Sequence, residues 1–285
     1  MSGYDPFAPG PFEVAATTVE LPDRARGRTL RCELWEPAGP AGPLVVYSHH
    51  AGGTGRVACF LTRHLASHGY RVAAVDHSET SVPELQPRAG ETPTERAARV
   101  EAIVGSRVPD VRLVLDRLAS DAAGLVGHSL GGWTVLAAPD DDPRVGAVVA
   151  HAPGGSRHPV PGVVAAPLRF TRAVPTLVLA AEDDEPVPLD DVLDVFGRIP
   201  GPRRLAVLEA AGHQHFADEI EPGTATPEEP QAFVRGLTLA HLDAYLRGIA
   251  AAHAVLERSA TARFPRPSHS ARQETGGGCA PGRLP

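Results

Sequence analysis

The stretch that decides the fold is residues 124–134, GLVGHSLGGWT. A short apolar run enters a Gly-x-Ser-x-Gly turn, and a small, apolar segment leaves it, which predicts a strand, a tight turn and a helix. A serine on such a turn sits in strained backbone, and bulky side chains at Gly127 and Gly131 would collide with the neighbouring strand and helix. The hydroxyl of Ser129 would lie at the helix N-terminus, which favours developing negative charge. Ser129 is therefore a candidate nucleophile.

Length and composition indicate one large domain. The chain has 285 residues, 42% of them hydrophobic, which suits one large α/β domain, with two small domains as the alternative. Its formal net charge of −7, without a basic block, argues against a nucleic-acid partner. No apolar run approaches ~20 residues, so no membrane span is expected. The N-terminus lacks a charged segment followed by an apolar one, so we see no signal peptide and expect a cytoplasmic protein.

The three cysteines, Cys32, Cys59 and Cys279, are an odd number with no pairing pattern and no metal-ligand spacing. We therefore expect reduced thiols.

Strands alternate with helices along the chain after an initial hairpin. Residues 12–21 and 29–35 alternate between apolar and polar, as in antiparallel strands. The later strands are continuous apolar runs, as in a parallel sheet buried on both faces. They are expected at 44–47, 70–75, 124–127, 145–150, 175–181 and 204–208, with helices at 57–67, 96–118, 189–196 and 232–256. The helix at 96–118 is expected to be interrupted around Val108 and Pro109.

This order predicts a doubly wound, mostly parallel, eight-stranded sheet. We assign residues 1–257 to one catalytic domain and residues 258–285, rich in Ser, Arg, Gly and Pro, to a disordered tail. The segment 153–172 is too short for a large lid domain.

Polar residues with catalytic chemistry follow several strands of this sheet. Ser129 follows one strand, Asp183 and Asp184 another, and His213 the last. Reactive side chains gather beyond the carboxyl ends of parallel strands, and the order Ser, Asp, His is that of the α/β-hydrolase triad. A serine hydroxyl needs a base beside it, and a carboxylate can hold that imidazole in the required tautomer.

The sequence resembles the α/β-hydrolase superfamily. More narrowly, it is similar to the predicted dienelactone hydrolases of actinobacteria, related to platelet-activating-factor acetylhydrolases and to cutinase-like, polyester-cleaving serine esterases. The residues that carry the resemblance are 4–7, 48–53, 65–70, 127–133, 152–155 and 213–216. The resemblance covers nearly all of 4–256 and implies an α/β-hydrolase fold with serine esterase chemistry.

The resemblance also implies which acid and base act. It favours Asp184 over Asp183, because the resembling enzymes place their acid three residues past the strand, and His213 over His215, because His213 matches their His-Gln-x-Phe pattern. His151 stands where the acetylhydrolases carry their acid. Dienelactone hydrolases proper use a cysteine nucleophile where this chain has a serine.

The oxyanion hole is expected to consist of two backbone amides. One is that of Leu130, directly after the candidate nucleophile. The second comes from the turn SHHAGG at 48–53, where the resemblance implies Ala51. His50 stands in this turn where glycine is usual, so His50 is an alternative donor and a possible substrate contact.

A metal site is not expected, because the six histidines that could meet near Asp183 and Asp184 show no helical His-x-x-x-His spacing. These six are His49, His50, His77, His151, His213 and His215. The one helically spaced pair, His64 and His68, lacks the glutamate of a zincin motif. We also expect no cofactor.

The sequence therefore predicts a serine hydrolase acting on a small-molecule carboxylic ester through an acyl-enzyme. The short, apolar lid region 159–168 points to short- and medium-chain esters, with polyesters and lactones as further candidates. A thioesterase, an acyltransferase or a cofactor-free perhydrolase would use the same triad. A catalytically silent binding module is the alternative from another class. The oligomeric state is left open.

Overall fold

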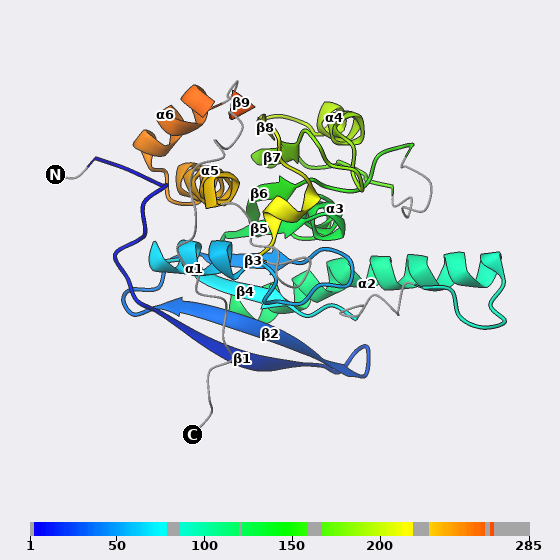
Figure 1. Ribbon diagram of the computed structural model, residues 1–285. Coiled ribbons are helices and arrows are strands. Elements are labelled where there is room, and N and C mark those ends of the chain that lie inside the picture. Colours follow the sequence, from blue (N-terminus) through cyan, green and yellow to red (C-terminus); the bar gives the residue numbers. More distant parts are fainter. Residues whose placement is uncertain are drawn as a thin grey trace.

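A computed structural model of the chain describes residues 3–78, 86–119, 121–158, 167–218, 228–259 and 263–264 (Figure 1). Its strands form one sheet in the order β1-β2-β4-β3-β5-β6-β7-β8-β9. They are β1 (Val14–Asp23), β2 (Arg28–Pro37), β3 (Leu44–Ser48), β4 (Arg71–Val75), β5 (Ala123–His128), β6 (Val145–His151), β7 (Thr176–Ala181), β8 (Arg203–Leu208) and β9 (Arg263–Phe264).

The sheet is mostly parallel. Only the pairs β1–β2 and β2–β4 are antiparallel, and the other six pairs are parallel. The predicted α/β-hydrolase fold is confirmed. The two-residue strand β9 is one more than the eight strands that we predicted, and it pairs with β8.

Helices cover both faces of the sheet. They are α1 (Cys59–Ser67), α2 (Pro93–Leu118), α3 (Leu130–Ala137), α4 (Leu189–Arg198), α5 (Glu228–Leu246) and α6 (Ala250–Ser259), with 3-10 turns at Ala138–Asp140 and His213–Phe216. One apolar cluster joins α2, α3 and α4 to the sheet, and another joins α1 and α5 to its opposite face. Helix α6 packs on the outside of α5.

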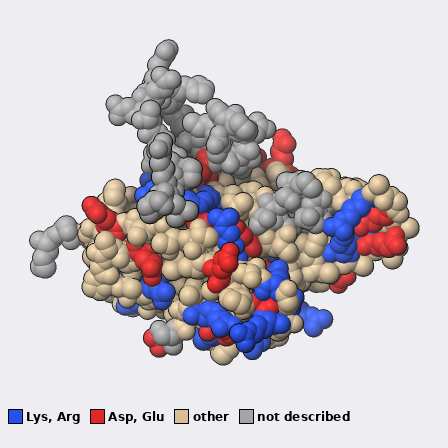
Figure 2. All heavy atoms as spheres, turned by 90° about the horizontal axis from the view of Figure 1, so that it is seen from below, with Lys and Arg blue, Asp and Glu red and all other residues tan. Residues whose placement is uncertain are grey.

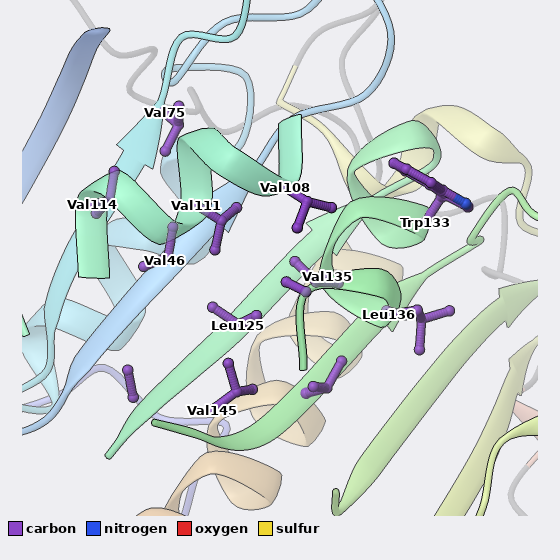
Figure 3. Close-up of a cluster of buried hydrophobic side chains, with 14 of the residues drawn as sticks. Val46, Val75, Val108, Val111, Val114, Leu125, Trp133, Val135, Leu136 and Val145 are labelled. Atoms are coloured by element: carbon purple, nitrogen blue, oxygen red, sulfur yellow. The ribbon is translucent and has the colours of Figure 1, made fainter. Parts of the chain in front are cut away.

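Side chains of β5 serve the two faces in turn, because successive residues of a strand point to opposite sides. Leu125 belongs to the cluster under α2 and α3, whereas Val126 belongs to the cluster under α1 and α5. Figure 3 shows Leu125 in the same apolar cluster as Val111 of α2 and Val135 of α3. This two-sided burial explains why β5 is a continuous apolar run.

Helix α2 runs unbroken through Pro109, so the predicted interruption is wrong. A proline removes one backbone hydrogen bond, and here tertiary packing outweighs that loss. Val108 and Val111, on either side of Pro109, are both buried in the core (Figure 3). The helix begins with a capping box in which Thr92 and Glu95 satisfy each other's backbone amides.

The C-terminal helix predicted at 232–256 is in fact two helices, α5 and α6. Gly248 lies between them with φ of +66°, a left-handed conformation that ends a helix and that glycine adopts without strain. Most of the predicted tail, 258–285, lies outside the described residues; its described parts are the end of α6 and strand β9.

The cysteines differ from our expectation of reduced thiols. Cys32 is buried and free, but Cys59, the first residue of α1, is disulfide-bonded. Cys279 lies outside the described residues. The prediction is therefore wrong for Cys59.

Charges of both signs are interspersed on the face that Figure 2 shows. In the β1–β2 hairpin, Arg26 pairs with Asp23, and Arg31 pairs with Glu33.

Within the described part of the chain, no helix has the length and apolar character needed to cross a bilayer. The expectation of a small-molecule partner stays a prediction.

Candidate active site

Ser129 occupies a strained turn between β5 and α3. Its φ is +58° and its ψ is −116°, a left-handed conformation that costs free energy in a non-glycine residue. A Cβ atom on Gly131 would lie 1.9 Å from the carbonyl oxygen of Ser48, and one on Gly127 would lie 2.2 Å from that of Gly131. Both glycines are thus required by close backbone contacts. The Ser129 side chain forms no capping hydrogen bond with α3, so the helix does not engage its hydroxyl.

The parallel strands bring the other loops to this turn. Ser48, the last residue of β3, is level with Gly127, and His128 is level with His151 at the end of β6. The Ser129 amide donates to the carbonyl oxygen of His151 over 2.9 Å. The turn is thereby anchored to the neighbouring strand, and the loop after β3 lies directly beside it.

Asp184 and His213 are joined by a hydrogen bond of 2.8 Å from Nδ1 of His213 to Oδ2 of Asp184. Asp184 follows β7 and its side chain is fully buried, whereas 16% of the His213 side chain is exposed. The second carboxylate oxygen of Asp184 accepts the amide of Val187 over 2.8 Å, which fixes the carboxylate. Because Nδ1 of His213 donates to a carboxylate, its Nε2 is left to accept a proton.

The two alternatives from the sequence occupy different positions. Asp183 is exposed to solvent. His215 is buried, and its Nδ1 accepts the amide of Gly212 over 2.8 Å. The structure thus brings Asp184, and not Asp183, to His213, and His215 serves the local backbone.

The imidazole of His213 lies against the nucleophile turn. Its ring centroid is 4.5 Å from that of His128, the residue before Ser129, and the His128 ring lies 5.4 Å from that of His50. His128 is fully buried, and burial holds its pKa well below the ordinary range. Burial also lowers the pKa of His50. The row His50, His128 and His213 therefore gathers at the carboxyl edge of β3, β5 and β8.

Three backbone amides are candidates for the oxyanion hole. Leu130 is the first residue of α3, and His50 and Ala51 follow β3. Among the hydrogen bonds of the described residues, none uses the amide of His50, Ala51 or Leu130 as its donor. All three amides are free to bind an anionic oxygen, so the choice between His50 and Ala51 stays open.

A buried polar network that was not predicted from the sequence holds the loop after β3. Arg107 and Asp110 lie one turn apart on α2, and both are fully buried. The signal was present in the sequence, since this pair interrupts the apolar residues Val104, Val108 and Val111 of the helix. An arginine and an aspartate are almost never fully buried unless paired, so this pair marks a specific role.

The histidines do not form a metal centre in the described part of the chain. No group of three or more His, Cys, Asp or Glu side chains there is arranged to hold a metal ion.

The fold and the site together define the class of α/β-hydrolase-fold serine hydrolases. Residues 8–225 match the family described as PET hydrolase-like, and the chain therefore belongs to that family.

Three curated relatives carry cutinase names. The chain is 26% identical to Cutinase est2 of Thermobifida alba over 181 residues, 63% of this chain and 54% of the relative. It is also 26% identical over 170 residues to Cutinase 2 of Thermobifida cellulosilytica and to Cutinase cut1 of Thermobifida fusca. These matches cover 59% of this chain and 58% and 48% of the relatives. The chain thus spans about half the length of the curated relatives it matches.

Proposed function

We propose that this protein is a carboxylic-ester hydrolase in which Ser129 is the nucleophile, His213 the general base and Asp184 the acid of the triad. The observation that carries the proposal is the hydrogen bond between His213 and the buried Asp184, at a site where the His213 ring lies against the residue before Ser129. The membership in the PET hydrolase-like family supports the same chemistry.

The reaction proceeds in two halves. His213 Nε2 takes the proton of the Ser129 hydroxyl as Oγ attacks the ester carbonyl. Asp184 keeps the imidazole in the required tautomer and stabilises the imidazolium that forms. The tetrahedral oxyanion is bound by the amide of Leu130 and by that of Ala51 or His50. Collapse expels the alcohol and leaves an acyl-enzyme, which water hydrolyses by the same steps.

For the substrate, we propose short- to medium-chain esters, with polyesters and lactones as further candidates. The cutinase names of the relatives support a carboxylic ester as the substrate. After His50, the loop that follows β3 continues with the small residues Ala51, Gly52 and Gly53. Most of the predicted lid region, 159–168, lies outside the described residues, and only 167 and 168 are described.

The predicted cytoplasmic location stays a prediction. The disulfide at Cys59 is an observation against it, because disulfides persist in oxidising compartments and are rare in the cytosol.

Hydrolysis of p-nitrophenyl esters of rising chain length tests the proposal. We expect turnover of acetate to octanoate esters by the wild type, and loss of turnover in Ser129→Ala and in His213→Ala. The exposed Asp183→Asn variant is the matched control for Asp184→Asn and is expected to retain wild-type turnover. If the folded wild type cleaves acyl thioesters but no oxygen ester, the proposed function changes from esterase to thioesterase. If it cleaves neither, the proposal that the protein is a hydrolase is refuted.

A further inference from the structure

The fully buried guanidinium of Arg107 reaches from α2 to the loop after β3. Its Nη1 donates to the carbonyl oxygen of His49 over 2.8 Å and to Oγ of Ser48 over 3.3 Å. Its Nη2 donates to the carbonyl oxygen of His50 over 3.3 Å. One side chain thus binds two successive carbonyls of the loop that supplies an oxyanion amide.

The peptide geometry links these carbonyls to the oxyanion candidates. The carbonyl of His49 shares a peptide unit with the amide of His50, and the carbonyl of His50 shares one with the amide of Ala51. In a planar, trans peptide the N–H and C=O bonds point in opposite directions. Because Arg107 holds both carbonyls toward the interior, both amides point away from its guanidinium. The same contact therefore orients whichever amide of the two binds the oxyanion.

We propose that Arg107 is a positioning residue for the oxyanion hole, which aims the amides of His50 and Ala51 at the substrate carbonyl. The inference rests on the proposed function, since an oxyanion forms only if Ser129 attacks an acyl group. Arg107 itself touches no reacting atom, because its fully buried guanidinium lies on the carbonyl side of both peptides.

A buried hydrogen-bond relay holds the loop from the same side. Nδ1 of His77 lies 2.9 Å from Oδ2 of Asp110, and Nε2 of His77 lies 2.9 Å from Oγ of Ser48. Asp110 also pairs with Arg26 and Arg28. The carboxylate fixes the proton on Nδ1 of His77, so Nε2 accepts from the Ser48 hydroxyl. Burial keeps the pKa of His77 well below its usual range, consistent with this neutral imidazole.

This relay has the residue types of a catalytic triad, but it cannot act as one. Ser48 and Asp110 are fully buried, and His77 is 1% exposed, so no ester can reach the Ser48 hydroxyl. The relay instead extends to His49, whose Nε2 accepts the amide of His77 over 3.1 Å. Nδ1 of His49 then carries the proton and donates to the carbonyl of His50 over 2.6 Å. The relay and Arg107 thus meet at the carbonyl of His50, in the peptide unit that carries the amide of Ala51.

The variants Arg107→Met and Arg107→Lys test the proposal. An oxyanion-hole donor acts in the transition state, so a misplaced donor lowers kcat and leaves KM nearly unchanged. For p-nitrophenyl butyrate we expect a kcat about 100-fold lower in Arg107→Met, the usual loss for one oxyanion donor, with KM within about threefold of wild type. Lysine can restore one of the two carbonyl contacts, so we expect an intermediate kcat, about 10-fold below wild type.

A buried charge elsewhere gives the control for stability. Asp243 of α5 is buried and accepts hydrogen bonds from the hydroxyls of Tyr4 and Tyr70. These two partners do not belong to the nucleophile turn. Asp243→Asn is expected to lower the denaturant midpoint and to keep kcat near wild type. As a second readout, Ki for an alkyl trifluoromethyl ketone, whose adduct mimics the tetrahedral oxyanion, should rise in Arg107→Met by the same factor as kcat/KM falls.

The outcomes separate this proposal from the proposed function. An Arg107→Met protein that is folded and has a kcat within about threefold of wild type would overturn the positioning role. If Arg107→Met does not fold, a wild-type kcat in Arg107→Lys would overturn the positioning role. A loss of kcat in Asp243→Asn as large as that in the Arg107 variant would also overturn it. A wild type without ester turnover would instead refute the esterase, and the positioning role with it.

Discussion

The histidine at the end of β6 makes folding stability depend on pH. His151 is fully buried, its Nε2 lies 3.1 Å from Oγ1 of Thr238, and its ring stacks on that of Phe216. Burial lowers the pKa of His151 to about 3, because the charged imidazolium loses its hydration. In the unfolded chain a histidine titrates near ~6.5. Between these two values, the unfolded chain binds a proton that the folded chain does not.

The free energy of unfolding must therefore fall as the pH falls through about 6.5, and this loss continues down to about pH 3. Each pH unit inside this window costs about 1.36 kcal/mol for one such site. At pH 5, His151 alone accounts for a loss of about 2 kcal/mol relative to pH 7. Buried His64 and His241, whose pKa values are each lowered to about 4, act in the same direction.

Urea unfolding of the wild type and of His151→Gln at pH 7 and pH 5 measures this contribution. Glutamine keeps a hydrogen-bonding side chain and does not titrate in this range. The free energy of unfolding of His151→Gln should therefore fall by about 2 kcal/mol less between pH 7 and pH 5 than that of the wild type. The exposed residue His158 supplies the control. His158→Gln changes a histidine on the surface of the molecule, and the free energy of unfolding of this variant should decline as much as that of the wild type. Equal declines in wild type and His151→Gln would refute the reasoning.

Three further predictions concern the turn, the acid and the cysteines. Gly131→Ala places a Cβ atom 1.9 Å from the carbonyl oxygen of Ser48. We therefore expect the free energy of unfolding to fall by about 3 kcal/mol and ester turnover to fall as well. A variant with the wild-type Tm would contradict this prediction. Asp184→Asn should lower kcat about 10⁴-fold with little change in KM, measured on p-nitrophenyl butyrate, and a tenfold loss or less would exclude its role. In denaturant without reductant, iodoacetamide should alkylate Cys32 and spare Cys59, as peptide mass spectrometry would show; alkylation of both would contradict the disulfide.

Much of the fold follows from local sequence patterns. The apolar run before Gly127 is buried on both faces of the sheet, and the glycines of the turn face backbone atoms at contact distance. The apolar run and the Gly-x-Ser-x-Gly motif are local patterns that the sequence reveals directly, whereas the contact of Gly131 with Ser48 is made between α3 and β3. Pro109 and Gly248 show where local patterns mislead, since packing carries a helix through the first and a left-handed backbone ends a helix at the second.

The buried support of the site was harder to predict. Arg107 lies on a helix that is otherwise amphipathic, and its partners, the carbonyls of His49 and His50, are backbone atoms far away in the sequence. No sequence spacing encodes such a contact. The disulfide at Cys59 escaped prediction because the three cysteines of the sequence show no pairing pattern. The pairing of His213 with Asp184 was accessible, since strand order places Asp183, Asp184 and His213 at one edge and the family resemblance favoured Asp184 and His213.

The most direct test of the esterase is covalent labelling by a fluorophosphonate, followed by intact-protein and peptide mass spectrometry. We predict one adduct per wild-type chain, located on Ser129, and no adduct on Ser129→Ala. Folded wild-type protein that remains unlabelled, or a Ser129→Ala variant that is labelled as fully as the wild type, would contradict the assignment of Ser129 as the nucleophile.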